Sequence, residues 1–131
     1  GWHHAYFGGP FVADRFEAWE YGPVVRSVRD AFADFGRRPI TRYAQRFDFV
    51  LGREVPVGDQ VSAPVKSLLA WTLATYGQQS AWALSEATHE NGSPWHQVWN
   101  AQDGRANVGL VIPDEKIAKH FANVYNEGGR N

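Results

Sequence analysis

The chain has 131 residues, a length that predicts one domain with a single core. It has no cysteine, which excludes disulfide bonds and cysteine-based metal sites and is compatible with a cytoplasmic protein. The net charge of −1 argues against a dedicated nucleic-acid binder, and no apolar run approaches the roughly 18 residues of a membrane-spanning helix.

The first residues of the chain predict the end of a helix. Residues 1–7 carry Trp2 and Tyr6 on one potential face, and Gly8-Gly9-Pro10 then breaks the pattern. Because the chain does not begin with Met, we expect the native start to lie upstream and this first helix to be truncated.

A stretch rich in aromatic side chains follows at residues 16–25, which read Phe-Glu-Ala-Trp-Glu-Tyr-Gly-Pro-Val-Val. Tyr21 and Gly22 predict a turn, and Pro23 suits the first turn of a helix because it lacks an N–H. Apolar side chains then recur at three- and four-residue steps, so we expect an amphipathic helix from about residue 23 to 35.

The middle of the chain is the least periodic part. Residues 37–60 contain the short apolar run Phe47 to Leu51, punctuated by glycines and prolines. A helix around 41–50, a pair of strands or an ordered loop would each fit this pattern, because periodicity cannot separate them over so short a run.

The second half of the chain predicts four helices. The most regular apolar stripe lies between Ser62 and Tyr76, which predicts the central core helix. Shorter helices are expected at 80–89 and 94–101, and a last one from Asp114 to about Tyr125, with a mobile tail at 127–131. The predicted fold is therefore mainly α, a compact single domain of about five or six helices joined by short loops.

No set of residues predicts catalysis. Glu17 and Glu20 are three residues apart, but charge near a helix N-terminus is a simpler role for them than acid–base chemistry. The adjacent His3 and His4 point in different directions on a helix, and no motif of a metalloprotease, hydrolase or phosphate loop occurs. We expect no enzyme activity, no catalytic residue, no bound metal and no cofactor.

Four aromatic side chains are candidates for a binding surface or for the core. Trp19 and Tyr21 flank the Gly-Pro break; we favour the core for Trp19, buried together with Phe16, and leave Tyr21 open. Trp95 and Trp99 lie one helical turn apart, and we expect one of them to be buried and the other exposed.

Positive charge is concentrated between residues 26 and 46. Six arginines and two aspartates lie in this segment, and the excess of positive charge would steer an acidic partner. The alternative is a solvated helix face with pairs such as Arg26–Asp30 at four-residue spacing.

Two consecutive helices, 62–76 and 80–89, could form a helix-turn-helix. The second helix offers Trp82, Glu86 and His89 where a recognition helix normally presents basic or amide side chains. We therefore interpret the pair as core architecture and consider nucleic acid an improbable partner.

Two motifs in this sequence resemble one known family. The first joins Gly1-Trp2-His3-His4 and the turn at 8–11 to the run from Phe16 to Val25; the second is Leu84 to His89 followed by Ser93-Pro94-Trp95. Together they are similar to the Panacea (SocA-like) domain, a family associated with phages and with bacterial toxin–antitoxin pairs. Members usually carry a further helix before the position where this chain begins.

The resemblance implies an antitoxin that neutralises its toxin by direct protein–protein binding in the cytoplasm. A proteolytic adaptor that delivers the toxin to an ATP-dependent protease is an alternative, and a helix-turn-helix DNA-binding regulator is another. The expected partners are the cognate toxin, an ATP-dependent protease and a second copy of the chain, without a membrane. The residues expected to contact a partner or to support the motif are Trp19, Glu20, Tyr21, Gly22, Pro23, Val24, Arg26, Arg29, Trp95 and Trp99.

Overall fold

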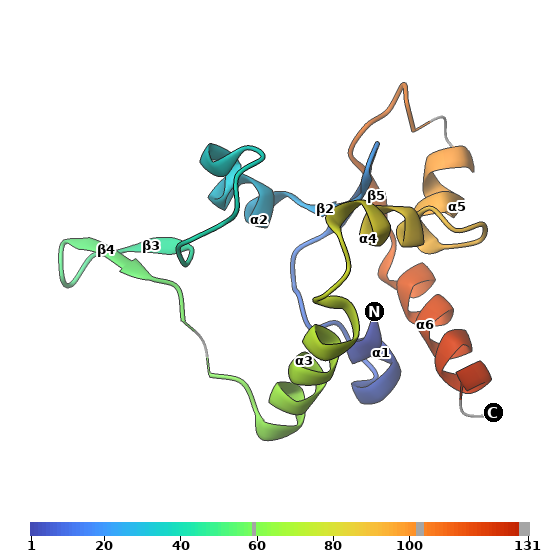
Figure 1. Ribbon diagram of the computed structural model, residues 1–131, viewed down its shortest axis with the longest axis horizontal. Coiled ribbons are helices and arrows are strands. Elements are labelled where there is room, and N and C mark those ends of the chain that lie inside the picture. The colour runs from blue at the N-terminus through green and yellow to red at the C-terminus, as the bar shows by residue number, and fades with distance from the viewer. Residues whose placement is uncertain (59, 102–103, 129–131) are drawn as a thin grey trace.

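A three-stranded antiparallel sheet organises the molecule. The computed structural model describes residues 1–58, 60–101 and 104–128 (Figure 1). Strand β1 (Phe16–Trp19) is central and pairs with both β2 (Gly22–Val25) and β5 (Leu110–Ile112), so segments from the two ends of the chain meet in one sheet. Within the described residues, six α-helices, one 3₁₀-helix and five strands occur.

The helices lie around this sheet and below it (Figure 1). Helix α2 (Arg26–Ala31) follows β2 and leads into the 3₁₀-helix at Ala33–Phe35, whereas α4 (Ala81–Thr88) and α5 (Pro94–Ala101) cover the sheet. Helices α1 (Trp2–Phe7), α3 (Ala63–Tyr76) and α6 (Asp114–Gly128) form a second group, in which α1 contacts both of the others. A separate hairpin of β3 (Gln45–Asp48) and β4 (Arg53–Pro56) extends away from both groups (Figure 1).

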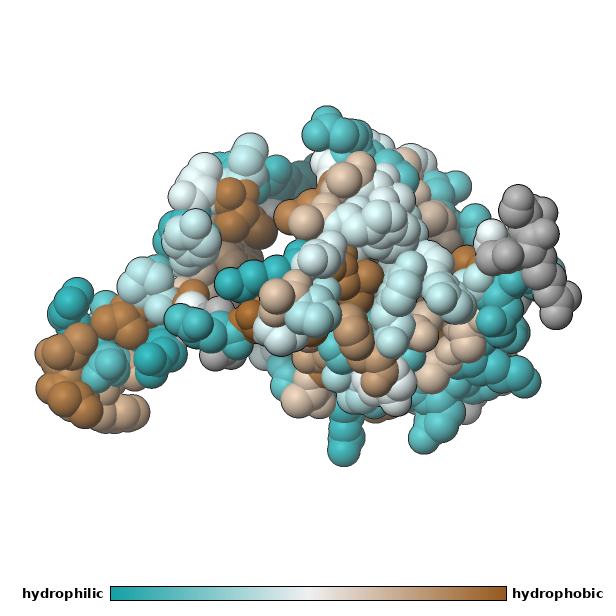
Figure 2. Space-filling model, turned by 90° about the horizontal axis from the view of Figure 1, so that it is seen from below, coloured by the Kyte–Doolittle hydropathy of each residue, from teal (hydrophilic) through white to brown (hydrophobic). Residues whose placement is uncertain are grey.

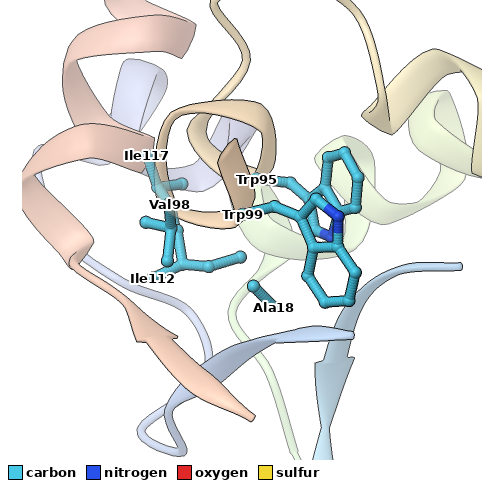
Figure 3. Packing of buried hydrophobic residues seen from close by; sticks show 6 residues of the cluster. All are labelled: Ala18, Trp95, Val98, Trp99, Ile112 and Ile117. Atoms are coloured by element: carbon cyan, nitrogen blue, oxygen red, sulfur yellow. The ribbon is translucent and has the colours of Figure 1, made fainter. Parts of the chain in front are cut away.

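The core lies between the sheet, α5 and α6 (Figure 3). Alternation along β1 turns Ala18 inward, where it is fully buried, and Ile112 of β5 joins it on the same face. Helix α5 is amphipathic and α6 places one buried side chain against it. The buried cluster consists of Ala18, Trp95, Val98, Trp99, Ile112 and Ile117.

The mainly α prediction is wrong, because five strands in two sheets stand beside the helices. The predicted helix at 23–35 is a strand followed by two short helical segments. Pro23 fits there because β2 is the outer strand of its sheet, where a missing N–H costs no ladder hydrogen bond. Gly22 ends the two-residue turn between β1 and β2 with a φ of 118°, a conformation that favours glycine.

The helix expected to form the centre of the core does not do so. Helix α3 matches its predicted span, but none of its residues is buried, and its apolar side chains are spread around the helix instead of forming one stripe. The expected tail is also shorter than predicted, since α6 continues through Glu127 to Gly128; residues 129–131 lie outside the described part of the chain.

Other boundaries are confirmed. Gly8 ends α1 in the left-handed conformation with a φ of 75°. The Ser80 side chain accepts a hydrogen bond from the Ala83 N–H at 3.1 Å and so caps α4. None of the helices in the described ranges has both the length and the apolar character that crossing a bilayer requires.

Candidate functional site

The turn between β1 and β2 is held by side chains that come from far along the chain. The Trp95 indole N–H donates to the carbonyl oxygen of Trp19 at 2.8 Å, and the Ser85 hydroxyl donates to that of Tyr21 at 2.7 Å. Between them, Nε2 of His89 lies 3.1 Å from the Glu20 carbonyl oxygen. Side chains of α4, α5 and the residue that follows α4 thus contact three consecutive backbone acceptors of a tight turn.

His89 connects the two helices to the turn. Its Nδ1 lies 2.6 Å from the Ser85 carbonyl oxygen, so both ring nitrogens face backbone acceptors. A neutral imidazole donates only one hydrogen bond, whereas the protonated ring donates to both. The ring also meets Trp95 edge-on, with centroids 3.9 Å apart. The histidine therefore belongs to the supporting structure of the turn.

Gly22 is required at the end of this turn for a second reason. A Cβ atom at this position would lie 2.7 Å from the Thr88 hydroxyl oxygen of α4. The helix therefore packs directly against the turn backbone, and a larger residue would push the two apart.

An ion-paired cluster lies on the opposite face of the sheet from the core. The Glu17 carboxylate accepts hydrogen bonds from Arg26 at 2.9 and 3.2 Å and from the Trp19 indole at 3.0 Å. The Arg26 guanidinium, followed by the Trp19 N–H, lowers the pKa of Glu17, and Glu17 in turn raises the pKa of Arg26. The Arg26 and Arg29 guanidinium groups lie 5.8 and 5.0 Å from the Trp19 ring centroid.

This arrangement corrects the prediction for Trp19. We predicted that Phe16 and Trp19 would be buried together because they are three positions apart in the sequence. In a strand, however, residues three apart point to opposite faces. Phe16 packs against the core, whereas Trp19 is half-buried on the other face beneath the arginines.

The two tryptophans of α5 are both internal, so the prediction that one is exposed is wrong. Trp95 is 5% and Trp99 is 9% exposed, and their rings stack at 5.3 Å (Figure 3). Trp95 also supports the turn through its indole N–H.

The arginine-rich segment is paired differently from the prediction. The expected Arg26–Asp30 pair does not form, although both residues lie in α2, because Arg26 binds Glu17 and Asp30 binds Arg29. Arg26 pairs with Glu17, Arg29 with Asp30, and Arg42 with Asp34, all at 2.9 to 3.0 Å, and these guanidinium groups stay about half exposed.

A surface hollow of about 270 Å³ lies beside the turn. Tyr21 and Trp82 are the most exposed rings at its edge, at 72% and 66%, while Trp95 and Trp99 form its floor. The charged side chains around it are Glu20, Glu86 and Arg105. Trp82 was not selected from the sequence as a site residue; its place two residues before the second motif was the available signal.

The remaining predicted site residues belong to the backbone of the hairpin. Pro23 is exposed and Val24 half-buried in β2, where each pairs with a residue of β1. The possible helix-turn-helix is not formed as a packed pair, because α4 packs on β2 and α5 while α3 packs mainly on α1. In the part of the chain that the structure describes, no group of three or more His, Asp or Glu side chains converges as a metal site.

Comparison with known proteins places both sequence motifs in one family. Residues 1–96 match the family described as antitoxin SocA-like, Panacea domain. The chain belongs to this family. The matched segment includes the β1–β2 turn and all three side chains that hold it, Ser85, His89 and Trp95.

One curated relative supports the same assignment. The Panacea-family chain is 31% identical over 114 residues to antitoxin SocA of Caulobacter vibrioides (strain NA1000 / CB15N). The alignment covers 87% of this chain but 61% of the relative, so the chain spans less than two thirds of that protein's length. No solved structure matches it.

Proposed function

We propose that this chain is an antitoxin that neutralises a toxin protein by binding it directly in the cytoplasm. Membership of the SocA-like Panacea family carries the proposal, together with the likeness to an antitoxin over 87% of the chain. The expected mechanism is steric and not enzymatic: a folded surface covers the toxin's active site or the path to it, and no covalent bond is broken.

The rim of the hollow beside the β1–β2 turn is the surface we assign to the toxin. Exposed Trp and Tyr side chains are the residue types that dominate the energy of protein interfaces, and Tyr21 and Trp82 lie there together. Hydrogen bonds from Ser85, His89 and Trp95 fix the turn beforehand. A partner therefore meets a preorganised surface, which lowers the entropy lost on binding.

Arginines elsewhere on the surface of the chain would favour an acidic partner through long-range attraction. Arg29 and Arg42 are each about half exposed, although both have an ion-pair partner. Guanidinium groups at the rim of an interface raise the association rate with a negatively charged surface and make it depend on salt. A stable interface buries about 800 Å² on each partner, which is a small part of the 9902 Å² that this chain exposes.

Co-expression with the product of the adjacent gene tests the proposal. We expect the two proteins to co-purify and the chain to restore growth of cells that produce the toxin. Tyr21→Ala combined with Trp82→Ala should weaken binding at least about tenfold, a loss of about 1.4 kcal/mol, without altering the circular dichroism spectrum. Leu73→Ala is the matched control, because this side chain is also exposed but lies on α3.

Three other outcomes would contradict the proposal or indicate a different function. A folded chain that forms no complex with its neighbour's product would contradict it. Disappearance of the toxin protein from cells, reversed when an ATP-dependent protease is deleted, would indicate delivery for degradation and not masking. Salt-dependent binding to promoter DNA without any toxin complex would indicate a regulator instead.

A further inference from the structure

The hollow beside the β1–β2 turn is lined by four aromatic rings, those of Tyr21, Trp82, Trp95 and Trp99. The first two are largely exposed, whereas the buried indoles of Trp95 and Trp99 stack with their planes 17° apart (Figure 3). In the space-filling view, polar and apolar side chains alternate over the body of the molecule, so no single apolar face marks a site there (Figure 2). The face of an aromatic ring carries partial negative charge and attracts a cation. The rings therefore favour a positively charged occupant over an anion.

Two carboxylates at the same hollow reinforce this preference. Glu20 belongs to the β1–β2 turn and Glu86 to α4, and both line the hollow. Both residues are exposed, and neither forms an ion pair with any residue that the structure describes. Their negative charge is therefore available to a partner.

Arg105, between α5 and β5, also lines the hollow but does not neutralise it. Its guanidinium is beyond ion-pair distance of Glu20 and Glu86, and against these two carboxylates it leaves an excess of one negative charge. His89 has no free ring nitrogen for a ligand, because the two nitrogens lie 2.6 and 3.1 Å from backbone carbonyl oxygens. The lining thus combines aromatic rings with an excess of acidic charge.

We propose that this hollow receives the side chain of one arginine of the toxin, an inference that rests on the antitoxin function proposed above. A flat guanidinium stacks on an aromatic ring and donates hydrogen bonds to carboxylates at its edge at the same time. A lysine ammonium is a compact, strongly hydrated charge without a flat face. A cavity of about 150 Å³ holds benzene, so a hollow of about 270 Å³ has room for the guanidinium and part of its stem.

The arginine-rich segment acts on a different part of the surface. Arg29 and Arg42 do not line the hollow, and each is paired with an aspartate. Their long-range attraction for an acidic toxin affects how fast the complex forms. The hollow acts at contact distance, where it selects one basic side chain. We therefore expect a toxin surface of mixed charge, with an arginine at the position that meets Tyr21 and Trp82.

The charge preference of the hollow can be measured without a toxin. N-acetylarginine methylamide is titrated into the isotopically labelled chain, and NMR follows the indole N–H of Trp82 and the amide of Tyr21. We expect saturable shifts of both signals, with an affinity that Glu86→Gln lowers at least about threefold. The norleucine derivative has a stem without charge and the glutamate derivative has the opposite charge, so neither should saturate. Equal shifts with the arginine and norleucine derivatives, or none with arginine, would overturn the proposal.

Affinity for the toxin tests the occupant. In the complex with the adjacent gene's product, Glu20→Gln combined with Glu86→Gln should raise the dissociation constant about tenfold, whereas Arg105→Gln should lower it about threefold. Glu54→Gln combined with Glu127→Gln is the matched control, because it removes the same charge from exposed positions of β4 and α6 outside the hollow. An acidic occupant predicts the opposite sign for each change, and an apolar occupant predicts no change; either result refutes the proposal.

Failure of this inference can be distinguished from failure of the antitoxin function. If the complex forms and the glutamate variants at the hollow bind as tightly as the control, the antitoxin function stands and the arginine contact is refuted. If no complex forms although the arginine derivative binds, the antitoxin function is contradicted, the toxin is excluded as the occupant, and the preference of the hollow for a guanidinium is confirmed.

Discussion

Replacing Trp95 by Phe tests the contact that joins the β1–β2 turn to α5. The substitution keeps an aromatic ring but removes the indole N–H that donates to the Trp19 carbonyl at 2.8 Å. Loss of one hydrogen bond to a half-buried carbonyl costs about 0.5–1.5 kcal/mol. Loss of part of the stacking on Trp99, whose ring lies 5.3 Å away, adds about 0.5–1.5 kcal/mol. We therefore expect the free energy of unfolding to fall by about 1–3 kcal/mol.

Urea denaturation followed by far-ultraviolet circular dichroism measures this change, since it does not depend on the fluorophore that is removed. Trp82→Phe is the matched control: the same chemical change at a side chain that is 66% exposed should cost less than about 0.5 kcal/mol. If both variants are equally stable, the hydrogen bond from Trp95 does not hold the turn, and our account of the site is wrong.

Three further perturbations address local features of the same structure. Gly22→Ala forces a φ of 118° on a residue with a Cβ that would lie 2.7 Å from the Thr88 hydroxyl, and we expect a loss of about 1–3 kcal/mol in thermal or chemical unfolding. The pKa of Glu17 is lowered from its usual value of 4.5, so its ionised form stabilises the fold above that pH and the contribution disappears as the pH falls; Glu17→Gln should therefore flatten the decline of stability in acid. Ser80→Ala should cost about 1 kcal/mol because this side chain caps α4, while Ser62→Ala, whose hydroxyl makes no cap bond, should cost much less; equal losses would contradict the capping assignment.

The boundaries of the later helices could be predicted because local chemistry sets them. Ser80 caps α4 with its own side chain, and Pro94 begins α5 directly after the Asn91 to Ser93 break. Such signals depend on neighbours within one helical turn. They do not depend on what the helix packs against, which is why the span of α3 was right and its burial was wrong.

The strands could not be predicted from the same reasoning. Residues 16–19 form a strand because β5, about ninety residues later, completes the sheet, and no local pattern of four residues encodes that pairing. Pro23 was assigned to a helix start because its lack of an N–H is tolerated there. It is tolerated equally on the outer edge of a sheet, so the residue alone does not distinguish the two environments.

In the candidate site, too, local features could be predicted from the sequence and distant contacts could not. The motif around Tyr21 and Gly22 was identified from sequence, and a turn was expected there. The groups that support the turn were not identified from sequence, because Ser85, His89 and Trp95 contact it only after the chain has folded back. Spacing along the chain therefore located the motif but could not separate its exposed ring at Tyr21 from its buried support.

The distance in sequence between the β1–β2 turn and the side chains that support it has a consequence for biosynthesis. The side chains that contact the turn's three carbonyl groups lie 64, 69 and 76 positions further along the polypeptide, so they are synthesised much later. A nascent chain released before residue 95 would present this segment to water and to proteases, and only translation past Trp95 would complete its support. Pulse proteolysis of ribosome-bound chains of increasing length should show resistance at the first hairpin appearing late and in one step.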